Sequence, residues 1–227
     1  MIDLSVFFEA MQESAYSIIK YISLDNYKEG NDIDIFCFDI NEIIRILSMV
    51  ASKNLLSQGY DVDIYECGNE KHVQFDIKRG DKLIFKFDLY GELPAYEKVN
   101  IKESFFAVVI ENSERSYYLN QEGKEFYVKH ASVLDELLLR YIEYIEWYEV
   151  RPDKIKHLDY IISKVEENET NIKFLDKLYY YTKLPDVKRK KRKKRCLIKD
   201  FVYKLKNTNV KRIVAFIKIK IDEKRNG

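Results

Sequence analysis

Three stretches of alternating apolar and polar residues between residues 61 and 90 constrain the fold of this chain most strongly. In each stretch every second residue is apolar: Val62 and Ile64; Val73, Phe75 and Ile77; Leu83, Phe85, Phe87 and Leu89. Successive side chains of a β-strand point to opposite faces, so this period places all of these residues on one face. Gly68-Asn69 and Arg79-Gly80-Asp81 separate the stretches and suit tight turns. The sequence therefore predicts an antiparallel three-stranded meander with one buried face.

The residues before the meander predict a helix, a strand and a second helix. Apolar residues recur at helical spacing from Leu4 to Tyr21, which predicts a helix there. The run Ile33–Phe38 is short, apolar and rich in Ile and Phe, as in a buried strand. Asp39, followed three residues later by Glu42, resembles a capping box that opens a helix ending near Ser57, before Gly59.

The C-terminal half is predicted to be mostly helical. Residues 90–131 show no clear period, and Phe105–Ile110 fits a strand or a helix. After Ser132, helices are expected in three places: from Leu134 to Ile145, from Ile155 to Ile162 and from Ile172 to Tyr181. We therefore predict an α+β fold in which residues 1–130 form an α/β domain, residues 131–182 a helical region and residues 183–227 a basic C-terminal tail.

Composition excludes several classes of protein. Hydrophobic residues make up 46% and charged residues 34% of the chain, which is typical of a folded, soluble protein. Neither GxxxxGK[ST] nor GxGxxG occurs, so a glycine-rich phosphate loop is not expected. No apolar run approaches the ~18 residues needed to span a bilayer, and the N-terminus lacks the basic region of a signal peptide. The scattered Cys37, Cys67 and Cys196 predict free, buried thiols and a cytoplasmic protein.

Two aspartates in the first predicted strand are the strongest candidates for chemistry. Asp32 and Asp34 alternate with Ile33 and Ile35, so both carboxylates lie on the face opposite the core. Such a pair repels itself unless a cation lies between the two groups, and Mg²⁺ prefers carboxylate and phosphate oxygens. Asp88 lies on the outward face of the third meander strand and is the candidate third ligand.

Other polar residues are weaker candidates. Asp76 is a reserve third ligand, and the outward Asp61 and Asp63 are interpreted as surface residues. Lys86 shares a face with Asp88, where it would neutralise phosphate or simply be an exposed strand lysine. The histidines His72, His130 and His157 have no metal-binding spacing, so a zinc site is not expected.

The order helix, Asp-x-Asp strand, helix and meander resembles the nucleotidyltransferase fold shared by DNA polymerase beta and poly(A) polymerases. Two stretches are similar to a branch from bacterial surface-polysaccharide gene clusters: residues 21–34, ending in Gly30-Asn-Asp-Ile-Asp34, and residues 135–157, which include Lys154-Ile-Lys-His157. The resemblance covers roughly residues 15–165. It implies a mixed sheet with flanking helices, followed by a helical region.

The resemblance also implies an activity and its residues. Asp32, Asp34 and Asp88 would hold Mg²⁺, and Asp88 would also take the acceptor's proton. A nucleoside triphosphate would give its nucleotidyl group to a sugar or glycan acceptor during cell-surface polysaccharide synthesis. The family grips the triphosphate with a Gly-Ser pair. Here Ser23 stands near that place, but Ile22 precedes it, and the chain has no Gly-Ser dipeptide. A catalytically degenerate binding or regulatory protein therefore stays open.

The charge of the chain is strongly divided. Residues 183–227 contain 18 Lys and Arg against 4 Asp and Glu, and Lys188–Arg195 are eight consecutive basic residues. This tail predicts an anionic partner. With the amphipathic Val210–Ile221, it fits peripheral association with an anionic membrane at the inner surface. The alternatives are packing of the tail on the acidic body, or RNA modification with the basic run tracking phosphates, which no RNA-binding motif supports.

Overall fold

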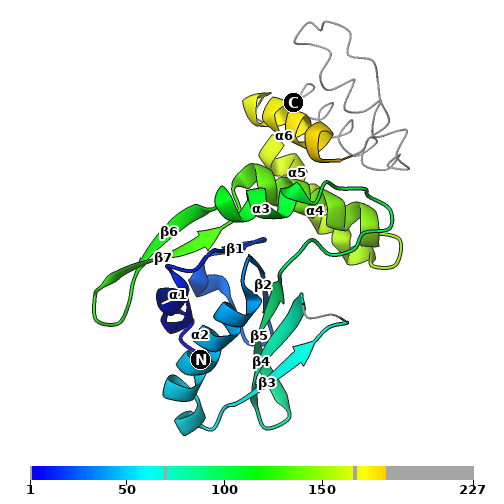
Figure 1. The fold of residues 1–227 in the computed structure, drawn as a ribbon. Helices are drawn as coiled ribbons and strands as arrows, with labels where there is room; N and C mark the ends of the chain where they lie inside the picture. Colours follow the sequence, from blue (N-terminus) through cyan, green and yellow to red (C-terminus); the bar gives the residue numbers. More distant parts are fainter. Residues whose placement is uncertain (1, 69–70, 166–167, 183–227) are drawn as a thin grey trace, which may run out of the picture. The chain divides into compact units, whose positions relative to one another are not determined.

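The structure is a computed structural model that describes residues 2–68, 71–165 and 168–182 (Figure 1). Its first part contains α1 (Ser5–Met11), β1 (Tyr16–Ile18), β2 (Asp32–Cys37), α2 (Ile40–Asn54), β3 (Asp61–Glu66), β4 (His72–Arg79) and β5 (Lys82–Tyr90). Its second part contains α3 (Ser104–Glu111), β6 (Glu114–Leu119), β7 (Glu125–His130), α4 (Val133–Trp147), α5 (Ile155–Val165) and α6 (Asn168–Tyr181). Short 3-10 turns lie at Leu24–Asn26, Leu56–Gln58 and Pro152–Lys154.

The strands form one seven-stranded mixed sheet in the order β3-β4-β5-β2-β1-β7-β6. The pairs β2–β5 and β1–β7 are parallel, and the other neighbours are antiparallel. The predicted meander is confirmed as β3-β4-β5, and the mixed sheet with flanking helices agrees with the α+β class. The parallel pair β2–β5 brings the first predicted strand beside the last strand of the meander.

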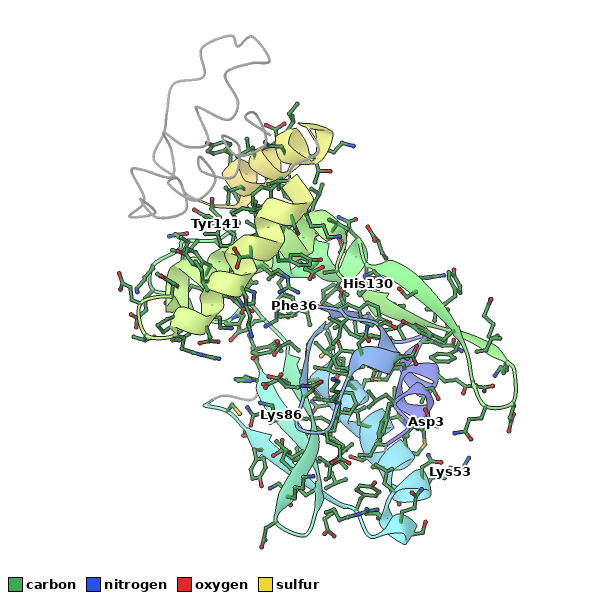
Figure 2. All side chains as sticks on the ribbon, turned by 180° about the vertical axis from the view of Figure 1, so that it is seen from behind. Asp3, Phe36, Lys53, Lys86, His130 and Tyr141 are labelled. Atoms are coloured by element: carbon green, nitrogen blue, oxygen red, sulfur yellow. The ribbon has the colours of Figure 1, made fainter. Side chains whose placement is uncertain are left out.

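One face of the sheet is apolar and packs against α1 and α2. Ile33 and Ile35 of β2 are buried there, and Phe87 of β5 contacts the rings of Phe7 and Phe8 in α1. Side chains fill the space between the sheet and these helices (Figure 2). The alternation read from the sequence therefore marks the core correctly and leaves the intervening residues on the other face of the sheet.

The second helix begins as its capping residues predict. The side chain of Asp39 accepts a hydrogen bond from the Glu42 amide at 3.0 Å, which satisfies one of the free donors in the first turn of α2. The helix ends at Asn54, and a 3-10 turn follows up to Gly59, which has a φ of +76°. A left-handed residue after a helix is usually glycine, because glycine has no Cβ to clash.

The helix predicted from Leu4 to Tyr21 is wrong in its second half. The helix α1 ends at Met11, and Tyr16–Ile18 instead form β1, a strand paired on both sides with β2 and β7. Tyr16, Ser17 and Ile18 are all buried. Over only three residues, Tyr16-Ser17-Ile18, the apolar positions do not distinguish the period of a strand from that of a helix.

The unassigned region contains both a helix and a hairpin. Phe105–Ile110 lies within α3, and β6 and β7 form an antiparallel hairpin that the sequence did not predict. Tyr117 and Leu119 of β6 are 59% and 69% exposed. Because β6 is an edge strand with bulky apolar residues in solvent, it lacks the alternation that revealed the meander.

The described residues form two compact units. The first comprises residues up to Ala95 together with Glu103–Glu136, and the second comprises Tyr96–Lys102 with the helical residues from Leu137 onwards. In the second unit the buried Glu146 accepts the amides of Glu97 and Lys98 at 3.0 and 2.9 Å. This carboxylate fixes the extended segment 96–102 to α4.

The helical region contains the three expected helices. Ser132 accepts the Asp135 amide at 3.3 Å at the start of α4, as the sequence predicts for a capped helix. The division at residue 130 stays a prediction, and residues 183–227 lie outside the described residues. Within residues 2–68, 71–165 and 168–182, no helix is long and apolar enough to cross a membrane.

Candidate functional site

Asp32, Asp34 and Asp88, here called the carboxylate cluster, lie together on the polar face of the sheet. The parallel pairing of β2 and β5 sets Asp34 directly opposite Asp88, and Asp32 opposite Lys86. One carboxylate oxygen from each aspartate lies within 4.8 Å of the others. The structure therefore brings together the three residues that the sequence selected as metal ligands.

The three carboxylates differ in burial. Asp32 at the start of β2 is exposed, Asp34 is half-buried, and Asp88 is only 5% exposed. Ile33 and Ile35 point into the core between them, as the alternation requires. The cluster thus has a solvent-facing entrance at Asp32 and a buried end at Asp88.

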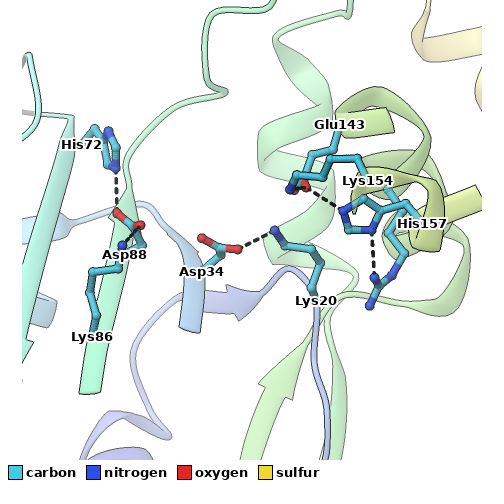
Figure 3. A network of polar contacts seen from close by, with 9 residues as sticks. Lys20, Asp34, His72, Lys86, Asp88, Glu143, Lys154 and His157 are labelled. Carbon is cyan, nitrogen blue, oxygen red and sulfur yellow. Dashed lines mark hydrogen bonds and ion pairs between the residues drawn. The ribbon is translucent and has the colours of Figure 1, made fainter. Parts of the chain in front are cut away.

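A lysine from the turn after β1 neutralises Asp34. The Nζ atom of Lys20 lies 2.6 Å from Oδ2 of Asp34, and the two side chains are only 20% and 14% exposed (Figure 3). The backbone fixes this position, because the amide of the preceding Ile19 donates to the carbonyl of Asp34 at 3.0 Å. Lys20 was not among the residues selected from sequence.

Both oxygens of Asp88 are engaged. His72 Nε2 lies 2.7 Å from Oδ1, and Lys86 Nζ lies 3.0 Å from Oδ2 (Figure 3). The His72 ring stacks on Tyr90, with 4.3 Å between centroids and 15° between planes. Tyr90 therefore fixes the plane of the imidazole, and the imidazole fixes the orientation of the carboxylate.

The charges of all three carboxylates in the cluster raise the pKa of Lys86. Burial lowers the pKa of Lys86, but the hydrogen bond to Asp88 and the charges of Asp88, Asp32 and Asp34 outweigh it, so the pKa lies above its ordinary value. The group is therefore a cation throughout the neutral range. Of the two sequence interpretations, the one in which Lys86 is a simple exposed lysine does not fit this geometry.

Tyr27 adds a buried hydroxyl near the cluster. The residue is 7% exposed, and its hydroxyl is buried. Burial raises the pKa of this phenol most, the charges of Asp34, Glu136 and Asp32 raise it further, and the nearby backbone of Ile22 lowers it. The phenol is thus a neutral donor within the field of the carboxylates.

Asp76 lies beside the cluster but is not part of it. It faces Lys86 across the β4–β5 pair and is 9% exposed, and no hydrogen bond from the described residues reaches its Oδ1. Burial raises the pKa of this carboxyl, and Lys78 and Lys86 partly offset that effect. Asp88, and not the reserve candidate Asp76, completes the cluster, because the parallel pairing brings Asp88 closer to β2.

The other sequence candidates lie apart from the cluster. Ser23 is half-buried at the start of the 3-10 turn Leu24–Asn26, and among the described residues no hydrogen bond or ion pair joins its side chain to the cluster. The Nε2 atom of His130 lies 2.9 Å from the Ser116 hydroxyl oxygen in the β6–β7 hairpin. The cysteines agree only in part with the sequence prediction: Cys37 is free and buried, Cys67 is free but half-exposed, and Cys196 lies outside the described residues.

His157 belongs to a buried network of the helical unit. Its Nε2 lies 3.2 Å from Glu143, which also holds Lys154 at 2.8 Å. Arg140 lies 3.1 Å from Nδ1, and because arginine can only donate, Nδ1 is the acceptor. Burial lowers the pKa of His157, so this ring is neutral and joins α4 to α5.

The donor set of the cluster fits a hard divalent cation. It consists of carboxylate oxygens alone, which Mg²⁺ prefers, and it is open to solvent at Asp32. A cavity of about 540 Å³ lies elsewhere, against α1 and α2, with Asp3 and Lys53 in its lining (Figure 2). The cluster is therefore separate from this cavity and lies on the face of the sheet opposite to these two helices.

Comparisons with known proteins identify no family. No family model matches the chain, and no curated protein matches it. Among solved structures, the crystal structure of JHP933 from Helicobacter pylori is similar at 8% identity and a TM-score of 0.34, with 98% of this chain and 92% of that chain covered.

Proposed function

We propose that this protein is a Mg²⁺-dependent nucleotidyltransferase whose metal ligands are Asp32, Asp34 and Asp88. The observation that carries the proposal is the parallel register of β2 and β5, which joins an Asp-x-Asp strand to a third aspartate. A strand pairing that places like charges opposite one another is unfavourable by itself. A cation bound between these carboxylates would offset that repulsion.

The residues of the site have distinct parts in this proposal. Bound Mg²⁺ would neutralise phosphate charge and stabilise the leaving pyrophosphate. Asp34 and Asp88 form the anchored part, because Lys20, His72 and Lys86 already fix their orientation. Asp32, the exposed member, faces the side from which a nucleoside triphosphate would arrive.

The fold family, the acceptor and the roles of individual residues are proposed from the sequence. The nucleotidyltransferase-like fold is proposed from the Asp-x-Asp strand and the resemblance, and so is a glycan acceptor of cell-surface polysaccharide synthesis. Lys86 and Ser23 are proposed to contact the nucleotide, and Asp88 to accept the proton of the attacking hydroxyl. The proton role requires Asp88 to release His72 or Lys86, because both carboxylate oxygens are engaged.

Calorimetry on the full chain tests the proposal. The wild type is expected to bind Mg²⁺ with a nucleoside triphosphate, and Asp34→Ala to lose that metal-dependent binding while its circular dichroism is unchanged. Asp63→Ala is the matched control, because Asp63 also pairs with a lysine of the sheet, Lys78, at 2.7 Å but lies outside the cluster. Equal nucleotide binding by wild type and Asp34→Ala would contradict the proposal.

A second candidate is a binding or regulatory protein without catalysis. The observation that favours it is the neutralisation of the inner carboxylates Asp34 and Asp88 by Lys20 and Lys86, together with the missing Gly-Ser pair. The two candidates differ in turnover. An enzyme releases pyrophosphate in the presence of its acceptor, whereas the binding protein retains the intact nucleotide.

A further inference from the structure

We propose that Asp76 is the second counter-ion of Lys86: Lys86 pairs with Asp88 in the free protein and passes to Asp76 when a metal ion binds Asp88. Asp76 is then a positioning residue of the site, although it is not a metal ligand. This inference rests on the proposed function, because it needs a metal ion in the carboxylate cluster. It goes further by saying how a carboxylate that already holds a lysine can receive that ion.

Lys86 lies between two carboxylates on the polar face of the sheet. Its Nζ atom lies 3.0 Å from Oδ2 of Asp88 (Figure 3), and across the β4–β5 pair it stands directly opposite Asp76. Directly opposite residues of an antiparallel pair have Cβ atoms about 4.5–5.5 Å apart. Because the lysine ammonium sits on a flexible aliphatic stem, side-chain rotation alone can carry it from Asp88 to Asp76.

Asp76 has the burial and the charge to attract this ammonium. The residue is 9% exposed, and no hydrogen bond from the described residues reaches its Oδ1. Its Oδ2 lies 4.0 Å from Nζ of Lys78, but that ammonium lies closer, at 2.7 Å, to Asp63. Removing a carboxylate from water is costly unless a cation or hydrogen bonds compensate it, so a direct contact with Lys86 stabilises Asp76.

A metal ion in the cluster changes which carboxylate attracts Lys86 most. A divalent ion on Asp88 repels an ammonium group that lies 3.0 Å from the same carboxylate. Asp32, which stands opposite Lys86 on β2, is itself one of the proposed ligands of the ion. Asp76 stands on the other side of Lys86, outside the cluster, and keeps its full charge. At Asp76 the ammonium stays on the polar face, beside the place where the nucleotide is proposed to bind.

The exchange predicts that substitutions of Asp76 and Lys86 are coupled. Lys86→Met removes a cation that competes with the metal, so Mn²⁺ binding is expected to tighten about 5- to 10-fold. Asp76→Asn removes the second counter-ion and keeps Lys86 on Asp88, so Mn²⁺ binding is expected to weaken about 5- to 10-fold. In the Lys86→Met background, Asp76→Asn should change the affinity by less than about twofold, because the lysine that it acts through is gone.

The experiment is a double-mutant cycle on the full chain, with Mn²⁺ affinity measured by electron paramagnetic resonance at constant ionic strength. Circular dichroism checks the fold of each variant, and Lys86→Gln is the second neutral variant if Lys86→Met does not fold. Asp76→Glu keeps the carboxylate and should retain most of the wild-type affinity. Asp61→Asn is the matched control: it removes an exposed carboxylate from β3, opposite Lys78, and should leave the affinity unchanged in both backgrounds.

The outcomes separate this inference from the proposed function. A loss of Mn²⁺ affinity in Asp76→Asn that disappears in the Lys86→Met background supports the exchange. A loss of the same size in both backgrounds means that the charge of Asp76 acts directly on the ion, and it overturns the exchange while the metal site stands. No loss in either background also overturns it. If the wild type does not bind Mn²⁺, the proposed function fails, and the inference fails with it.

Discussion

Asp34 and Asp88 stand directly opposite each other on two parallel strands, although a helix and a β-hairpin separate these strands in the chain. Like charges in this position repel each other across the strand pair. The protein offsets the repulsion with Lys20 on Asp34 and with Lys86 on Asp88, and His72 lies 2.7 Å from the other oxygen of Asp88. The ammonium groups of these lysines therefore hold the carboxylates in the arrangement of a metal site.

Metal ions are expected to stabilise the protein against heat. An ion that binds only the folded state adds RT ln(1 + [L]/Kd), which is about 2.7 kcal/mol at 100 times Kd. The midpoint of thermal unfolding of the wild type should therefore rise with added MnCl₂, and that of Asp88→Asn should not. Scanning fluorimetry at constant ionic strength checks this, and an equal rise in both proteins would count against the cluster as the site.

Loss of the histidine beside Asp88 is expected to weaken metal binding without disrupting the sheet. His72→Phe keeps the stack on Tyr90 but loses the 2.7 Å contact to Asp88. Groups that orient metal ligands typically contribute 10- to 100-fold in affinity, so we expect Mn²⁺ binding about tenfold weaker. His130→Phe, in the β6–β7 hairpin, should bind Mn²⁺ like the wild type.

Asp76 gives the protein a defined dependence of stability on pH. Its native pKa is raised by burial, so between the ordinary aspartate pKa and that raised value the folded state binds more protons than the unfolded state. Stability is thus lost as pH rises through this window, and the cost is fully present above it. Asp76→Asn should be more stable than the wild type at pH 7, by less than about 1 kcal/mol.

Urea denaturation of both proteins at several pH values checks this sign. The advantage of Asp76→Asn should shrink as pH falls through the window, because the wild-type carboxyl becomes protonated there. A gain that stays constant with pH would mean that the substitution acts through packing and not through charge.

The sequence was informative where one face of an element is buried and the other is polar. Phe85, Phe87 and Leu89 alternate with Lys86 and Asp88, and this predicts both the core and the third aspartate. It failed at Tyr16–Ile18, where three residues are too few to show a period, and at β6, where Tyr117 is exposed. In both places tertiary surroundings determine the structure, not the local pattern.

The polar partners of the cluster were harder to predict than its carboxylates. Lys20 is brought to Asp34 by the β1–β2 pairing, and β1 was not expected as a strand. His72 gave a usable signal, because it lies on the same strand face as Gln74 and Asp76 in the meander. Without the register between β4 and β5, however, that face does not reveal that His72 contacts Asp88.

Phe87 is expected to be the most sensitive single position of the core. Its ring is fully buried and lies within 5.3 to 6.3 Å of the rings of Phe7, Phe8, Phe75 and Phe85. Phe87→Ala leaves a cavity between the sheet and α1, and should lower the free energy of unfolding by about 3–5 kcal/mol. Leu119→Ala, 69% exposed, should change it by less than about 0.5 kcal/mol in the same urea titration.

The basic tail is proposed to bind anionic membranes, and its charge alone makes a prediction. Lys188–Arg195 carry eight consecutive positive charges, and each Lys or Arg near an anionic surface contributes ~1 kcal/mol. The full chain should therefore co-sediment with vesicles containing phosphatidylserine, and a version ending at Pro185 should not. Neutral phosphatidylcholine vesicles and 0.5 M NaCl should each abolish the binding of the full chain, because salt screens the attraction. Equal partitioning of the two versions would end the membrane proposal and favour docking of the tail on the acidic residues of the body.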